Sequence, residues 1–162
     1  MTDHELDTLA RKVGEALAAR GLWLATAESC TGGWIAAAVT AIAGSSNWFD
    51  RGFVTYSNAA KVDMLGVRDD TLDTHGAVSE ATVGEMASGA LARSRADLAL
   101  AVSGIAGPGG GSAAKPVGTV CLAWARRDVP AVMTTVHLAG DRAAVRRQAV
   151  ILALQGVLER CG

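Results

Sequence analysis

Apolar residues follow two different spacings along the chain, and each spacing predicts a type of element. From Leu6 to Leu17 the apolar residues recur at helical intervals up to Gly21, which predicts an amphipathic first helix. The preceding segment, Thr2-Asp3-His4-Glu5, has the pattern of a capping box with Thr2 as the N-cap. Short apolar runs without this periodicity predict buried strands.

The rest of the chain alternates such runs with helical periodicity. Strands are expected at 22–27, 52–56 and 98–102, with a hairpin at 119–125 and 132–138. Helices are expected at 34–43, 57–65, after Ser79 and after Asp141, with these last two residues as N-caps. Because helices and strands alternate before the hairpin, we expect one domain over 1–162, a three-layer α/β/α fold with a mixed, mostly parallel sheet.

Composition narrows the functional classes. Half of the 162 residues are hydrophobic and 19% are charged, with a formal net charge of -1. This balance excludes a disordered chain, and the absence of a basic excess argues against a nucleic-acid partner. The longest apolar stretch, 34–43, is too short for a membrane span, and the N-terminus lacks signal-peptide features, so we expect a cytoplasmic protein. The three cysteines are widely spaced and predict neither disulfides nor a metal site.

The segment Ala27-Glu28-Ser29-Cys30-Thr31-Gly32-Gly33 lies between a predicted strand and a predicted helix. Backbone N–H groups at a helix N-terminus converge there, and glycines let a ligand approach the backbone. A hydroxyl at this place can bind an anion or attack a carbonyl while the amides of 31–33 stabilise the oxyanion. Equally, Ser29 or Thr31 could only cap the helix.

Cys30 is a rival nucleophile in the same segment. A thiol beside a helix N-terminus gains thiolate character, and His75 and His137 are available in principle as a base. A buried structural cysteine is the more common alternative.

A serine nucleophile requires a base, and Lys61 can supply it if burial keeps the amine neutral. The chain has only three lysines and one tyrosine, yet Tyr56 and Lys61 lie five residues apart. Tyr56 could relay a proton or position a substrate. A solvated lysine and a strand-end tyrosine are the alternatives.

Two further segments are candidates for ligand binding. The glycine-rich stretch 103–112 follows a predicted buried strand and either closes over a small ligand or is a flexible surface loop. Arg142 and Arg146 lie one turn apart at the start of the last helix, where an anion would offset their unfavourable position in the helix dipole. Solvated surface arginines are the alternative.

Seven segments in this order resemble the CinA C-terminal-domain family over nearly the whole chain. They are Ala27–Gly33, Gly44-Ser45-Ser46 with Trp48, Gly52–Asn58 with Lys61, Gly76–Glu80, Ser103–Pro108, Lys115–Thr119 and Gly140-Asp141-Arg142. The longer members carry an additional N-terminal domain that resembles molybdopterin-binding proteins. The sequence here is similar to the stand-alone type.

The resemblance implies hydrolysis of the carboxamide of nicotinamide mononucleotide to nicotinate mononucleotide and ammonia, a step in pyridine nucleotide recycling. It implies Ser29 as nucleophile, Lys61 as base and Tyr56 nearby, with no metal and no cofactor. The matching segments suggest a substrate-binding set of Thr31, Gly32, Gly33, Ser46, Ser103, Gly107, Arg142 and Arg146. The resemblance and the apolar content also suggest a homodimer.

Two other functions fit the same sequence. Longer family members are linked to competence and DNA-damage responses, so the chain could be a non-catalytic module that binds a nucleotide or a partner. It could also be an amidase with a different substrate.

Overall fold

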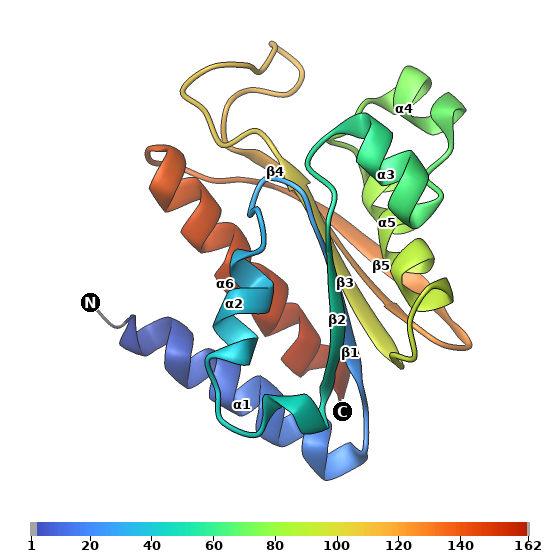
Figure 1. Cartoon of the computed structure of the whole chain (residues 1–162). Helices are drawn as coiled ribbons and strands as arrows, with labels where there is room; N and C mark the ends of the chain where they lie inside the picture. The colour runs from blue at the N-terminus through green and yellow to red at the C-terminus, as the bar shows by residue number, and fades with distance from the viewer. Residues whose placement is uncertain (1–2, 162) are drawn as a thin grey trace.

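One five-stranded sheet lies at the centre of the computed structural model, which describes residues 3–161 (Figure 1). The strand order is β2-β1-β3-β4-β5, with β1 at Leu24–Glu28, β2 at Phe49–Val54, β3 at Leu98–Gly104, β4 at Thr119–Arg126 and β5 at Val129–His137. β1 pairs in parallel with β2 and β3, whereas β4 is antiparallel to both β3 and β5. The sheet is therefore mixed as predicted, and only β4 runs against the direction that the other strands share.

Helices cover both faces of the sheet and complete the three predicted layers (Figure 1). One face carries α1 (His4–Arg20), α2 (Trp34–Thr40) and α6 (Arg142–Cys161), and the other carries α3 (Asn58–Leu65), α4 (Asp69–His75) and α5 (Glu80–Ala92). The apolar side chains form one buried cluster beneath each helical layer. Among residues 3–161, no helix combines the length and hydropathy needed to cross a bilayer.

Several element ends differ from the sequence prediction. The N-cap of α1 is Asp3, whose carboxylate accepts the Leu6 amide at 3.1 Å, while the predicted cap Thr2 lies outside the described residues. Arg147 also binds Asp3, and this ion pair lowers the pKa of the Asp3 carboxyl to about 2. An acidic side chain thus serves both the helix start and a contact to α6, which the local capping pattern cannot show.

Other differences follow from weak local signals. α2 stops at Thr40 rather than residue 43, and β2 is shifted to 49–54 from the expected 52–56. The sequence pattern missed the short 3-10 helix η1 (Ser45–Asn47) and also α4. Leu72 is the only large apolar residue of α4, so this segment has no helical periodicity to detect.

Close packing of α5 on α3 depends on Gly89. A Cβ atom at this position would overlap the carbonyl oxygen of Leu65, which belongs to the backbone and cannot rotate away. We expect Gly89→Ala to lower the free energy of unfolding by about 3 kcal/mol in urea titrations. Gly109→Ala is the matched control, because a Cβ there meets no atom within 4 Å, and it should change stability by less than about 0.5 kcal/mol. Equal stability of the two variants would contradict this packing.

Candidate active site

Ser29 occupies the turn between β1 and α2, at the carboxyl end of the parallel strands. Its N–H donates to the Val102 carbonyl at 3.0 Å, which extends the pairing of β1 with β3 by one residue. This register places Ser103 beside Ser29 on the neighbouring strand, about 4.8 Å away in backbone spacing. Both side chains are buried. The turn then passes through Gly32 and Gly33, whose positive φ angles of 60° and 99° favour glycine.

Lys61 meets Ser29 from the opposite side of this turn. Ser57 caps α3 by accepting the Ala60 amide, so Lys61 lies in the first turns of a helix that follows β2 directly. The Lys61 amine lies 2.9 Å from Ser29 Oγ, 2.9 Å from the Thr55 carbonyl and 3.5 Å from the Tyr56 carbonyl. Carbonyl oxygens only accept, so a neutral amine can direct its two N–H bonds at them and its lone pair at the Ser29 hydroxyl.

Burial favours that neutral form of Lys61. The side chain is only 1% exposed, and desolvation lowers the pKa of its ammonium group below the ordinary value of 10.5. Within residues 3–161 no carboxylate forms a salt bridge with Lys61 that would counteract this effect. An uncharged amine held against a serine hydroxyl is the arrangement of a nucleophile and its general base. The solvated-lysine alternative is therefore wrong.

Glu28 is a buried residue of the candidate site that the sequence analysis did not single out. Its fully buried carboxylate accepts the Thr31 hydroxyl at 2.6 Å and the amides of Ile35 and Ala36 at 2.9 and 3.0 Å. The Glu28 side chain therefore caps α2, whose N-cap residue is a glycine. It also accepts the hydrogen bond of the Thr31 hydroxyl, so that hydroxyl is not free to donate to a ligand. The helix-cap alternative for Ser29 is wrong. The sequence signal that could have identified Glu28 is an acidic residue shortly before a predicted helix, where a negative charge is stabilised.

The backbone amides of the turn differ in their partners. Gly32 N–H donates to the Ser29 carbonyl at 3.0 Å, so it stabilises the turn and is not free for an oxyanion as predicted. The amides of Thr31 and Gly33 have no acceptor within residues 3–161. Two of the three predicted amides are thus without an acceptor in the described chain, that of Thr31 in a fully buried residue and that of Gly33 in a half-buried one.

Cys30 does not have the environment of a nucleophile. It is buried, its Sγ lies beside Gly104, and burial raises the pKa of the thiol to about 11. His75 and His137 are both exposed, and no hydrogen bond within the described chain joins either of them to Cys30. The Cys30 thiol is therefore buried in the core and protonated at neutral pH.

We expect Cys30→Ala to keep at least about half of the wild-type kcat, since it removes only a packed thiol, with a stability loss of about 1 kcal/mol. Ammonia release and urea unfolding measure the two effects. Loss of catalysis in a folded Cys30→Ala protein would restore the thiol as a nucleophile candidate.

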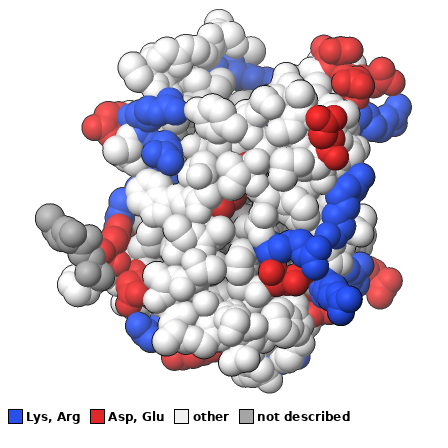
Figure 2. Space-filling view, viewed as in Figure 1, with Lys and Arg blue, Asp and Glu red and all other residues white. Residues whose placement is uncertain are grey.

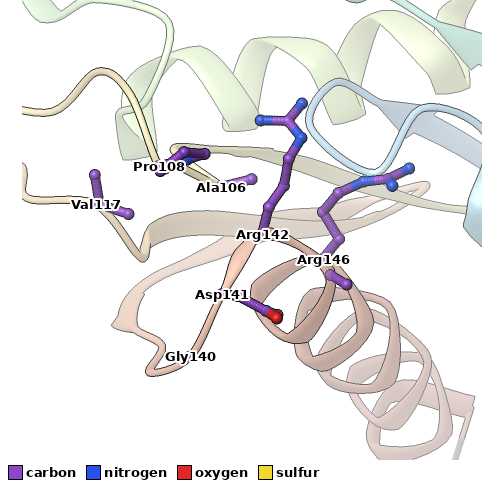
Figure 3. A pocket seen from close by; sticks show the side chains of 8 residues that line it. Ala106, Pro108, Val117, Gly140, Asp141, Arg142 and Arg146 are labelled. Atoms are coloured by element: carbon purple, nitrogen blue, oxygen red, sulfur yellow. The ribbon is translucent and has the colours of Figure 1, made fainter.

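Tyr56, Gly107 and Arg142 come together from three different elements. The Arg142 guanidinium donates to the Gly107 carbonyl at 2.8 Å and to the Tyr56 hydroxyl at 3.1 Å. Arg142 also lines a cavity of about 690 Å³ with Ala106, Pro108 and Asp141 (Figure 3). Arg142 therefore links the end of β2, the loop after β3 and the start of α6 around one space.

The loop between β3 and β4, residues 105–118, contains most of the glycine-rich stretch and is held at two points, which the flexible-loop alternative did not anticipate. Arg142 binds its first part at Gly107, and the Lys115 amine binds its last part to the His75 carbonyl at 2.5 Å. The second contact joins the loop to the C-terminal end of α4. The loop is thereby attached to α6 near its start and to α4 near its end.

Arg146 binds the backbone of the Ser29 turn. Its guanidinium donates to the carbonyls of Cys30 and Thr31 at 3.0 and 3.1 Å and lies 5.5 Å from the centre of the Trp34 ring. Arg142 and Arg146 leave the first turns of α6 as neighbours (Figure 3). Their contacts nevertheless differ, because Arg146 binds backbone carbonyls where the sequence suggested an anion.

Ser46 is the predicted site residue that the structure does not bring to Ser29. It is exposed in η1, just before β2, whereas Ser29 follows β1. β1 and β2 are parallel, and Phe49 pairs with Leu24 at the start of β1. Ser46 and Ser29 therefore lie at opposite ends of these two strands, separated by the length of a strand.

Sequence and structure comparisons agree on the class of protein that this fold and site define. The CinA C-terminal domain model matches residues 6–161, so the chain belongs to the CinA C-terminal domain family. The chain is 60% identical over 155 residues to the nicotinamide-nucleotide amidohydrolase PncC of Escherichia coli (strain K12), covering 96% of this chain and 94% of that protein. A relative of the same name from Pseudomonas putida is 53% identical, with 95% and 96% covered.

Solved structures show the same fold. The competence/damage inducible protein CihA from Agrobacterium tumefaciens superposes with a TM-score of 0.95 at 50% identity, over 98% of this chain and 97% of the other. A CinA superfamily protein from Klebsiella pneumoniae gives a TM-score of 0.92 at 46% identity, over 96% and 97%. The three-layer architecture is thus that of the family.

Proposed function

We propose that this chain hydrolyses the carboxamide of nicotinamide mononucleotide to nicotinate mononucleotide and ammonia, as a step in pyridine nucleotide recycling in the cytoplasm. The observation that carries the proposal is the 2.9 Å contact between the Lys61 amine and Ser29 Oγ in a buried site. Relatives named nicotinamide-nucleotide amidohydrolase, at up to 60% identity over almost the full chain, support the substrate class.

The proposed reaction is acyl transfer through Ser29. Neutral Lys61 takes the hydroxyl proton as Ser29 Oγ bonds to the amide carbon, and the free amides of Thr31 and Gly33 stabilise the oxyanion. When the C–N bond breaks, the Lys61 ammonium returns its proton to the leaving group, which departs as ammonia. Water, deprotonated by Lys61, then attacks the ester carbonyl, and as the bond to Ser29 Oγ breaks the Lys61 ammonium returns its proton to Ser29, which releases nicotinate mononucleotide.

The remaining residues would bind the rest of the nucleotide. Arg142 lines the large cavity next to the turn and offers a guanidinium to the substrate phosphate, with which it can form paired hydrogen bonds. Tyr56 and the loop at Gly107 contact Arg142 and so would fix its position. Ser103, adjacent to Ser29 on β3, would face the reacting amide.

Nucleic acid does not enter this proposal. On the face shown in Figure 2 most of the surface is uncharged, and the lysine and arginine side chains occur in small separate groups. This face has no continuous basic patch that would follow a phosphate backbone.

We also propose that the chain forms a homodimer. β5 is an edge strand of nine residues without Lys, Arg, Asp or Glu, and Val129, Val132 and Met133 are exposed along it. Uncharged edge strands invite pairing with another strand, and antiparallel pairing of two copies places no like charges opposite each other. Light scattering on a size-exclusion column should give twice the chain mass, and a monomer would contradict this point.

Release of ammonia by the purified protein tests the proposed function. With nicotinamide mononucleotide as substrate, we expect ammonia and nicotinate mononucleotide in equal amounts. Parallel reactions with nicotinamide and with its riboside test the substrate class, and preference for either would indicate a different amidase. Binding of the mononucleotide without ammonia would support the non-catalytic module.

A further inference from the structure

Two carbonyls of the Ser29 turn accept hydrogen bonds from a residue 115 or more positions away. Arg146 donates its Nε to the Cys30 carbonyl at 3.0 Å and one Nη to the Thr31 carbonyl at 3.1 Å. The fork of the guanidinium thus spans two consecutive peptide groups. Arg146 lines the same cavity as Arg142, but its hydrogen-bond partners differ, since Arg142 binds the Gly107 carbonyl and the Tyr56 hydroxyl.

Peptide geometry carries the effect of these contacts to the other side of the turn. In a trans peptide the C=O and the following N–H point in opposite directions. The Cys30 carbonyl therefore cannot turn toward Arg146 without turning the Thr31 N–H away from it. The next peptide follows the same rule, since its Thr31 carbonyl binds Arg146 and its Gly32 N–H binds the Ser29 carbonyl.

The Thr31 N–H is the donor that these contacts leave without an acceptor among the described residues, in a fully buried residue beside Ser29. It has no acceptor within residues 3–161, although Glu28 holds the side chain of the same residue at 2.6 Å. A cation on the carbonyl oxygen of a peptide also draws electron density from its N–H and strengthens that donor. The contacts of Arg146 thus determine the orientation of the Thr31 amide and also increase its polarity.

We propose that Arg146 is a positioning residue, which aligns and polarises the Thr31 peptide N–H as the oxyanion donor for Ser29. The proposal rests on the serine mechanism above and changes the role of Arg146 from phosphate ligand to support of the transition state. An oxyanion donor acts on the chemical step, whereas a phosphate ligand acts on substrate binding as well.

The distinction is measurable with Arg146→Met and Arg146→Lys. We expect Arg146→Met to lower kcat for nicotinamide mononucleotide roughly 10- to 100-fold and to change KM by less than about 3-fold. Arg146→Lys keeps the charge but forms fewer hydrogen bonds to the two carbonyls, so its kcat should lie between those of Arg146→Met and the wild type. If Arg146→Met does not fold, Arg146→Lys provides the same comparison of kcat with KM. Added guanidinium ion at millimolar concentration should raise kcat of Arg146→Ala.

Arg147→Met is the matched control on the same helix. Arg147 binds Asp3 and Glu5 at the start of α1, so its loss should weaken the fold and leave kcat unchanged. Arg142→Met provides the contrasting result, a raised KM for the mononucleotide.

Each alternative outcome has a different meaning. A rise in KM with unchanged kcat in Arg146→Met would overturn the proposal and return Arg146 to the phosphate. Unchanged kcat and KM would show that Arg146 has no part in the reaction. A wild-type protein that releases no ammonia would instead defeat the proposed function itself.

Discussion

Replacement of Ser29 by alanine is expected to lower kcat for ammonia release by at least about 10³-fold. The change removes the atom that forms the acyl-enzyme in the proposed mechanism, and the neighbouring Cys30 thiol should not replace it, because burial raises its pKa to about 11. The fold should persist, since Ser29 is bound to β3 through its backbone amide. Initial rates and circular dichroism of the two proteins measure both effects.

Ser46→Ala is the matched control for this experiment. It also removes a serine hydroxyl, but from an exposed position at the opposite end of the strands, so its kcat and KM should equal those of the wild type. A folded Ser29→Ala protein with more than a few per cent of wild-type kcat would exclude Ser29 as the nucleophile.

Replacement of Lys61 by methionine is the second large effect that we expect, a loss of about 10³-fold in kcat. Methionine retains the apolar length of the side chain but provides no base for the Ser29 proton. The Thr55 and Tyr56 carbonyls also lose their donor, so a stability change of up to about 2 kcal/mol in either direction is expected. Lys61→Arg should be equally inactive, because a guanidinium stays protonated.

Lys12→Met is the control for Lys61→Met, since it replaces an exposed lysine of α1 and should not alter the rate. Wild-type rates for Lys61→Met would require another base for Ser29.

The pH dependence of the wild-type enzyme provides an independent signature of Lys61. Only the neutral amine can accept a proton, and burial lowers the pKa of Lys61, so kcat/KM should rise with pH and level off below 10.5. The folded state then binds fewer protons than the unfolded state between the two pKa values, so Lys61 makes stability increase as pH rises through that window. Lys61→Met should lack this contribution in urea titrations at several pH values.

Local signals were sufficient for most of the fold. α1 ends before Gly21 and α3 ends at Leu65 as the sequence predicted, and Ser79 caps α5. The predicted hairpin is β4 and β5. In each of these places the residue that decides the element lies within a few positions of it. At the start of α1 the predicted N-cap was one residue early, because two adjacent residues can both cap a helix and Asp3 accepts the Leu6 amide.

The site could be predicted only as a set of candidates. Sequence order gives no distance between Ser29 and Lys61, which are 32 residues apart and meet only because β2 pairs in parallel beside β1. The same sheet separates Ser46 from Ser29, although they are closer in sequence. Arg146 shows the limit most clearly, because its helix position suggested an anion and its partners are carbonyls of a distant turn.

Hydroxylamine trapping tests the serine mechanism most directly. An acyl-enzyme on Ser29 reacts with hydroxylamine as well as with water, so wild-type protein turning over nicotinamide mononucleotide should form the nucleotide hydroxamate alongside nicotinate mononucleotide. Ser29→Ala should form neither product. Ammonia release by the wild type without any hydroxamate, or hydroxamate formation by Ser29→Ala, would contradict the mechanism.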